Sequence, residues 1–359
     1  MQAELSPRRS PRPLPHSPPA ALRLDLDRDA LAANWRALDR LSGAARAGAA
    51  VKADGYGLGA RRVSEVLAGE GCRDFFVAHW SEAAPLLHVI DPATLSVLHG
   101  PLHAADVEYA RATGVRPVIN SVAQARRWRD AGGGVCDLMV DTAMNRLGVG
   151  LAELGDEAIR ALDIDVLHSH LVSAEQDLPV NALQHRRWRE ARQALRHRRA
   201  SLANSAGITL GEAFHGDLTR PGLSLYGGVP CAALAPHIRQ VARPQAALIQ
   251  TRDLAAGESV GYDATFTAPR DMRIGTVALG YADGYLVCWS ERGAMLQEGR
   301  RLPVLGRVSM DMTVIDLSGA PDLAEGDWVE VEYALAAASG ACGLSQYELL
   351  TSLGRRFAR

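Results

Sequence analysis

The sequence predicts an α/β protein with two domains, a (β/α)8 barrel of the TIM type followed by a mostly-β domain. Eight short apolar runs alternate with amphipathic stretches up to residue 228, and short alternating runs replace this pattern after about residue 230. A chain of 359 residues is also longer than most single domains. We therefore expect an Arg/Pro-rich disordered tail at 1–20, the barrel at 21–230 and the β-domain at 231–359.

The eight predicted barrel strands are nearly continuous apolar runs, as expected for parallel strands covered on both faces. They are GAAVKAD (48–54), DFFVAHW (74–80), LSVLHG (95–100), RPVINS (116–121), DLMVDT (137–142), DVLHSHL (165–171), ASLANSAG (200–207) and LTRPGLSLYG (218–227). An open doubly wound sheet fits the same spacing, but no G-x-G-x-x-G fingerprint follows the first strand. The barrel is therefore the favoured arrangement.

Three of the connecting stretches have clear helical periodicity, at 60–71, 121–133 and 181–199. We expect Ser121 and Asn181 to be N-caps, and Gly71 and Gly132 to end their helices. In the second domain, Gly, Pro and Asp separate short strand-like runs. These runs are AALIQTRDL (246–254), MRIGTVALG (272–280), RLPVLGRVSMDMTVIDL (301–317) and DWVEVEYAL (327–335).

The composition excludes several classes of protein. With 39 basic and 41 acidic residues the formal net charge is −2, so nothing indicates nucleic-acid binding. No apolar run reaches the roughly 18 residues of a membrane span. The five cysteines form no CxxC pair, which argues against a zinc site or a disulfide framework. Because the first residues also lack the apolar core of a secretory signal, we expect a cytoplasmic protein without a metal site.

Lys52 is the only lysine among the 39 basic residues. Arg and Lys exchange freely on surfaces, but only Lys offers an amine that can form a Schiff base. Lys52 also lies at the C-terminal end of the first predicted barrel strand, where barrel enzymes place their active sites. The alternative is an ordinary surface residue. Position and uniqueness favour a Schiff-base lysine, which leaves class I aldolases and pyridoxal phosphate enzymes open.

Eight blocks in order then resemble the alanine racemase family, whose members are built as a barrel plus a β-domain. The resemblance covers roughly residues 22–359. Its blocks are AAVKADGYGLG (49–59), DTAMNRLGVG (141–150), HSHLVSAEQ (168–176), ANSAGI (203–208), TRPGLSLYG (219–227), GYDATF (261–266), GYADGY (280–285) and GRVSMDMTVID (306–316). It implies an isomerase that interconverts L- and D-alanine with pyridoxal 5'-phosphate, either supplying D-alanine for the cell wall or degrading it.

The resemblance also implies the cofactor site. Lys52 would hold the cofactor as a Schiff base, and Arg220 would donate a hydrogen bond to the pyridine nitrogen, supported by His170. A permanent cation beside that nitrogen disfavours its protonation. The phosphate would be held by Tyr56, Ser205 and the backbone N–H groups of Gly222 and Leu223, with Asn204 orienting this shell.

Racemisation requires two acid/base groups, because the proton leaves one face of the α-carbon and arrives on the other. The resemblance assigns these roles to Lys52 and Tyr262. It implies that Tyr262 comes from the partner subunit of a head-to-tail homodimer. Arg146 would bind the substrate carboxylate, with the backbone N–H of Met310 and the neighbouring Asp311 from the partner chain.

The sequence departs from the family pattern at several positions. Met139 stands where many members have a carbamylated lysine that contacts the arginine equivalent to Arg146. Val287 stands near a position that is often arginine, and Arg355 near one that is often tyrosine. These changes keep open a racemase of broader or different specificity, for example for serine. A pyridoxal-phosphate decarboxylase lacks support because its Cys-Glu-Ser block is missing, and a non-catalytic cofactor carrier would be a single barrel.

Overall fold

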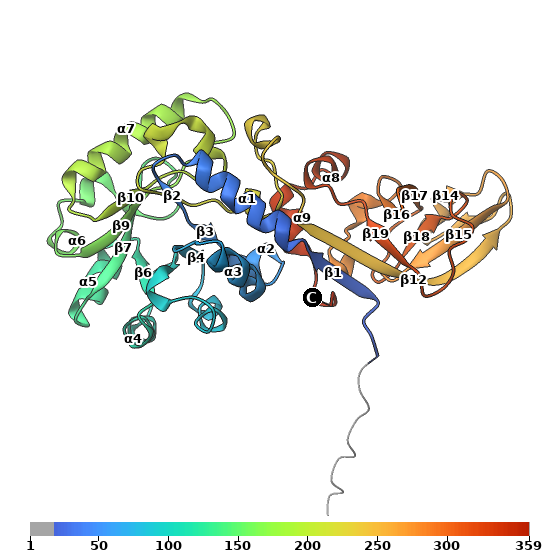
Figure 1. Ribbon diagram of the computed structural model, residues 1–359, viewed down its shortest axis with the longest axis horizontal. Coiled ribbons are helices and arrows are strands. Elements are labelled where there is room, and N and C mark those ends of the chain that lie inside the picture. The colour runs from blue at the N-terminus through green and yellow to red at the C-terminus, as the bar shows by residue number, and fades with distance from the viewer. Residues whose placement is uncertain (1–17, 359) are drawn as a thin grey trace, which may run out of the picture.

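The computed structural model describes residues 18–358, and its first part is the predicted parallel barrel (Figure 1). Seven parallel strands are hydrogen-bonded in the order β10–β9–β7–β6–β5–β4–β3. Their bounds are β3 (Ala49–Ala50), β4 (Phe75–Val77), β5 (Leu95–Val97), β6 (Arg116–Ile119), β7 (Val135–Asp141), β9 (Asp163–His168) and β10 (Arg199–Ser201). The short β8 (Val149–Gly150) pairs with β7.

The eighth barrel strand is β11 (Leu218–Thr219), which pairs in parallel with β2 (Arg46–Ala47) just before β3. On its other side, Asp217 N donates to Ala200 O (2.8 Å) and Arg220 N to Ala203 O (2.8 Å). The ring of strands is thereby closed. Each of the eight predicted runs overlaps one of these strands, although β7, β9 and β10 begin one or two residues before their runs, so the predicted barrel is confirmed.

Helices cover the outside of the barrel (Figure 1). They are α1 (Arg28–Leu41), α3 (Ala60–Gly69), α4 (Ala104–Thr113), α5 (Val122–Asp130), α6 (Glu157–Arg160) and α7 (Pro179–Ala194). Ser121 caps α5 as predicted, its Oγ accepting from Gln124 N. The predicted cap Asn181 is wrong: α7 begins at Pro179, whose fixed φ suits a first helical position. Asn181 is buried inside α7 and donates to Ser173 O and Gln176 O.

The second domain is built on antiparallel strands that close on themselves in the order β12–β15–β18–β17–β16–β19–β12. The bounds are β12 (Ala242–Leu254), β15 (Met272–Val277), β16 (Ala294–Gln297), β17 (Arg300–Leu305), β18 (Thr313–Asp316) and β19 (Trp328–Val331), with a small hairpin of β13 (Ser259–Val260) and β14 (Phe266–Thr267). The long β12 changes partner along its length, which closes the ring.

Two segments join the domains. The strand β1 (Leu22–Leu26) lies in the range predicted for the barrel but pairs antiparallel with β12. Near the other end of the chain, α8 (Leu335–Cys342) is followed by α9 (Gln346–Ser352), which packs on α2 (Lys52–Tyr56). One apolar cluster runs through both domains and includes Leu24, Val51 and Val329.

The predicted tail at 1–20 lies, up to residue 17, outside the described residues. None of the helices described in residues 18–358 is long and apolar enough to cross a membrane.

Candidate active site

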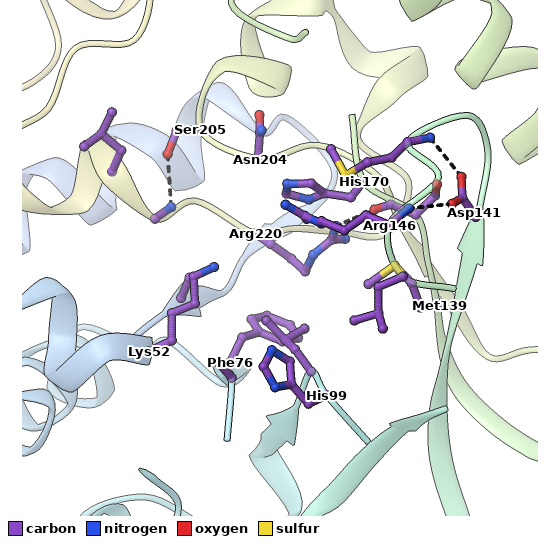
Figure 2. Close-up of a pocket in the computed structure, with 18 of the residues that line it drawn as sticks. Lys52, Phe76, His99, Met139, Asp141, Arg146, His170, Asn204, Ser205 and Arg220 are labelled. Carbon is purple, nitrogen blue, oxygen red and sulfur yellow. Dashed lines mark hydrogen bonds between the residues drawn. The ribbon is translucent and has the colours of Figure 1, made fainter. Parts of the chain in front are cut away.

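A cavity of about 620 Å³ opens at the C-terminal ends of the barrel strands. Nine residues expected from the sequence line it: Lys52, Tyr56, Arg146, His170, Asn204, Ser205, Arg220, Gly222 and Leu223. Figure 2 shows Lys52 on one side of this cavity, with Arg220, His170 and Arg146 grouped on the other. The barrel thus gathers residues that are up to 171 positions apart in the chain (Lys52 to Leu223).

Lys52 lies two residues after the end of β3 and begins α2, which is an unusual turn. The next four residues all have positive φ: Ala53 (54°), Asp54 (53°), Gly55 (64°) and Tyr56 (54°). This is a left-handed helical turn, which costs about 1–2 kcal/mol for each residue other than glycine. Two carboxylates stabilise it. Asp54 Oδ1 accepts from Ala60 N (2.9 Å), and Glu82 Oε1 accepts from Ala53 N (2.5 Å).

The environment of Lys52 favours a free amine. Burial lowers the pKa of its ammonium, the cation of Arg146 lowers it further, and Glu82 partly opposes both. An amine with a lowered pKa is more often unprotonated near neutral pH, and only the unprotonated amine can attack a carbonyl. The surroundings of the chain's only lysine therefore increase the fraction of its amine that is unprotonated and able to attack a carbonyl.

A group of donors beside Lys52 suits a phosphate. Ser205 Oγ accepts from the backbone N–H groups of Gly222 (3.0 Å) and Ser224 (3.3 Å). A Cβ on Gly222 would lie 2.3 Å from the Tyr56 hydroxyl, so only glycine leaves room for that hydroxyl. The Tyr56 ring stacks on Tyr226 with centroids 4.6 Å apart. Hydroxyls and backbone amides that converge in this way are typical of anion sites.

Arg220 is held by acceptors that account for four of its five N–H groups. Nη1 donates to Ser201 Oγ and lies 3.3 Å from His168 Nδ1. Nη2 donates to Ser169 O (2.5 Å) and Leu202 O (3.5 Å). Among residues 18–358 no acceptor pairs with Nε–H, and Arg220 lines the cavity. Burial lowers its pKa to about 10, which still leaves a cation at neutral pH.

The expected support of Arg220 by His170 is not what the structure shows, because the imidazole that accepts from Arg220 is that of His168. Both imidazoles point into the barrel, since alternate residues of a strand share a face. His168 lies deeper, level with Arg220, whereas His170 lies in the cavity wall. Burial, then the cations of Arg220, Arg146 and Lys52, lower the pKa of His170 to about 3, so it is neutral at pH 7.

Arg146 extends from a loop that Asp141 shapes. The Asp141 carboxylate accepts from the backbone N–H groups of Ala143 (2.8 Å), Met144 (2.8 Å) and Arg146 (3.2 Å). No acidic side chain in the described part of the chain pairs with the Arg146 guanidinium. Met139 lines the cavity, so the side chain at the position expected for a carbamylated lysine is apolar and carries no charge for Arg146.

The other predicted site residues lie outside this cavity. Tyr262 is 70% exposed and Met310 53% exposed. Asp311 pairs with Arg356 (2.7 Å). Tyr262 belongs to η9 (Tyr262–Ala264), which connects β13 to β14, and β14 lies at the end of the molecule farthest from the barrel (Figure 1).

Of the positions where the sequence departs from the family pattern, Val287 and Arg355 are not among the residues that line the cavity of their own chain. Instead α9 contributes Tyr347, whose ring centroid lies 6.3 Å from that of Tyr56. Burial, with a smaller effect of Glu175, raises the pKa of Tyr347 to about 12, so it is a neutral donor. Sequence reasoning missed Tyr347 because nothing local links α9 to the barrel.

Comparison with known proteins agrees with this geometry. The sequence profile described as "Alanine racemase, N-terminal domain" matches residues 26–230, and "Alanine racemase, C-terminal domain" matches 241–359. The alanine racemase of Methylobacterium nodulans is 41% identical over 94% of this chain and 95% of that protein. The catabolic alanine racemase of Agrobacterium fabrum is 39% identical over 94% of this chain and 91% of that protein.

Solved structures agree as well. The alanine racemase of Bartonella henselae with covalently bound pyridoxal phosphate superposes with a TM-score of 0.87, at 32% identity over 95% of this chain and 99% of that one. The biosynthetic alanine racemase of Pseudomonas aeruginosa gives a TM-score of 0.84 at 35% identity, over 95% of this chain and 99% of that one. Matches to both domain profiles, over nearly the whole length, establish that this chain belongs to the alanine racemase family.

Proposed function

We propose that the protein interconverts L- and D-alanine with pyridoxal 5'-phosphate attached to Lys52. The observation that carries this proposal is the cavity itself. It combines the chain's only lysine, an anion-binding group of donors and one free N–H of a buried arginine. The donor set fits the cofactor, because it offers an amine for the aldehyde, hydroxyls and amides for the phosphate, and a donor for the ring nitrogen.

The residues around the cofactor would divide the work. When bound, pyridoxal phosphate supplies an electron-accepting ring that stabilises the charge left on the α-carbon after proton removal. Tyr56, Ser205, Gly222 and Leu223 would hold the phosphate, and Arg220 would donate its Nε–H to the ring nitrogen. Lys52 anchors the cofactor and moves a proton on one face of the α-carbon.

The second face requires a second acid/base group, which we assign to Tyr262 of the partner subunit in a head-to-tail homodimer. The exposure of Tyr262 and Met310, and the distance of β14 from the barrel in Figure 1, support this arrangement. Met310 N–H and Asp311 would come from the partner with Tyr262. Arg146 would bind the substrate carboxylate, since its guanidinium has no acidic partner among the described residues.

We place the activity in the cytoplasm, since all five cysteines are free of disulfides. There it would supply D-alanine for the cell wall or degrade it. The test is a racemisation assay with purified protein, added pyridoxal phosphate and the common L-amino acids. We expect alanine to give the highest kcat/KM. Fast racemisation of serine with slow turnover of alanine would replace the alanine assignment by that of a racemase of different specificity.

A further inference from the structure

The interior of the barrel contains a charged cluster beside a small apolar one formed by Phe76, Val166 and Leu218. Barrel interiors are usually filled by layers of branched apolar side chains. Here Arg116 lies between Asp74 (3.2 Å) and Asp165, and Arg199 pairs with the same two carboxylates at 2.9 and 2.7 Å. Asp74 and Arg116 are buried. Because buried charges are costly unless they are paired, such a cluster requires a specific arrangement of partners.

Asp137 connects this cluster to the site. It is fully buried on β7. Its Oδ2 accepts from Ser96 Oγ (2.6 Å) and lies 3.8 Å from Arg116 Nε and 3.4 Å from His168 Nε2, while Oδ1 accepts from Val166 N (3.1 Å). Burial alone would raise the pKa of this carboxyl, but Arg116, His168 and Ser96 hold it well below its usual value. Asp137 is therefore a carboxylate that faces His168.

The contacts of His168 determine which of its nitrogens carries the proton. A guanidinium can only donate, so Nδ1, which lies 3.3 Å from Arg220 Nη1, must be the unprotonated acceptor. The proton then lies on Nε2, which faces the Asp137 carboxylate. Burial lowers the pKa of His168 below its ordinary value, and the cations of Arg220 and Arg116 add to this, while Asp137 partly opposes it. The ring is therefore neutral at pH 7.

The buried charges around His168 sum to zero when its imidazole is neutral. Three carboxylates then face three guanidinium groups: Asp74, Asp137 and Asp165 against Arg116, Arg199 and Arg220. A protonated His168 would add a fourth cation in contact with Arg220. The arrangement thus favours one protonation state of the imidazole.

We propose that Asp137 and His168 are positioning residues for Arg220. The carboxylate faces the Nε2–H of the imidazole, and the imidazole, with Ser201, fixes Nη1, so that the guanidinium is held at the cavity with its Nε–H unpaired among residues 18–358. One part of this proposal rests on the proposed function: that the group accepting from Arg220 Nε–H is the ring nitrogen of pyridoxal phosphate. The network below Arg220 is independent of it.

The first test measures the tautomer of His168 directly. Nitrogen-15 NMR of histidine-labelled full-length protein, with and without pyridoxal phosphate, distinguishes Nδ1–H from Nε2–H, and the signal is assigned by its loss in His168→Gln. We expect Nε2 protonated and Nδ1 unprotonated between pH 6 and pH 9. A signal of the Nδ1–H tautomer or of an imidazolium would overturn the proposal, whether or not the protein proves to be a racemase.

The second test compares two variants of His168. Gln carries both an acceptor and a donor, whereas Leu carries neither. For His168→Leu we expect pyridoxal phosphate to bind at least about tenfold more weakly, the scale of losing a hydrogen bond to a charged group, with an altered absorbance spectrum of the bound cofactor. His168→Gln should restore most of the affinity and the spectrum. Wild-type affinity and spectrum in His168→Leu would contradict a positioning role.

A matched control separates positioning from folding. His215 is also buried, with both ring nitrogens near backbone carbonyls (2.9 Å to Ser42 O and 2.8 Å to Ile208 O), and it does not line the cavity. His215→Leu should lower stability without changing the cofactor spectrum. If His168→Leu does not fold, Asp137→Asn serves instead. Nδ1 should stay unprotonated because Arg220 still donates to it, but the nitrogen-15 shift of Nε2 should change when the facing carboxylate is lost. An unchanged Nε2 shift would exclude a role for Asp137.

Discussion

The Glu82 carboxylate accepts a hydrogen bond from the backbone N–H of Ala53, the residue after Lys52, at 2.5 Å. The other Glu82 oxygen accepts from Ala78 N (2.8 Å) and His79 N (2.9 Å). Glu82 ends η1 (Trp80–Glu82), just after β4. One side chain therefore fastens the left-handed turn that carries Lys52 to the end of the neighbouring strand.

Replacing this carboxylate by an amide should affect both the turn and the lysine. In Glu82→Gln one of the two accepting oxygens becomes an NH2 group, which cannot accept from the backbone N–H that it faces. We therefore expect the free energy of unfolding to fall by about 1–3 kcal/mol. Because Glu82 raises the pKa of Lys52, that pKa should fall further. Urea unfolding and the pH dependence of amine labelling at Lys52 measure the two effects. The control is Glu65→Gln, which removes only a surface pair with Arg61, and an equal effect there would contradict the role of Glu82.

Gly222→Ala tests the phosphate site. The added Cβ would lie 2.3 Å from the Tyr56 hydroxyl, so the tyrosine must move. We expect at least about tenfold weaker binding of pyridoxal phosphate, which corresponds to about 1.4 kcal/mol, measured by absorbance titration of cofactor-free protein. Gly155→Ala is the control, since nothing lies within 4 Å of a Cβ at that exposed position. Unchanged affinity in Gly222→Ala would show that the phosphate binds elsewhere.

Tyr262→Phe tests the second acid/base group. Cofactor absorbance should persist, because the cavity residues proposed to hold the cofactor are unchanged, while racemisation should fall by at least about 100-fold. The control is Tyr109→Phe, a half-buried tyrosine packed on Trp80. Wild-type turnover in Tyr262→Phe would rule out the two-base scheme.

A mixture of two inactive variants tests whether subunits share sites. If Tyr262 acts on the partner's cavity, a heterodimer of Lys52→Ala and Tyr262→Phe chains contains one site with both residues intact. Mixing the variants under conditions that exchange subunits should restore up to about half of the activity per heterodimer, as one of its two sites is complete. Activity that stays at the level of the separate variants after proven exchange would place Tyr262 and Lys52 of one chain in the same site.

His170 should make stability depend on acidity. Its pKa is about 3 in the folded protein and 6.5 ordinarily, so the unfolded chain binds more protons between these values. The free energy of unfolding should therefore rise with pH from about pH 3 to pH 6.5, with a contribution of up to about 1.4 kcal/mol per pH unit. Urea titrations of cofactor-free protein, at one protein concentration, should show a shallower rise for His170→Gln. An identical pH profile would show that folding does not lower the pKa of His170.

The sequence predicted those features that local patterns encode. The barrel strands lie in nearly continuous apolar runs, and the single lysine indicated the site. The misplaced features depend on contacts between distant segments. The motif HSH contains two inward imidazoles, and only their depth in the barrel identifies His168 as the partner of Arg220. Tyr347 enters the cavity because α9 packs on α2, far away in the sequence. The pairing of β1 with β12 also joins segments that are far apart in the sequence, so no local pattern predicted it.

The central claim is that Lys52 carries the cofactor, and the single lysine makes the test direct. Borohydride reduction of the protein loaded with pyridoxal phosphate, followed by peptide mass spectrometry, should find the phosphopyridoxyl group on the peptide that contains Lys52 and at most a trace on the α-amino group. Loaded protein that shows no label at Lys52 after reduction would contradict the account.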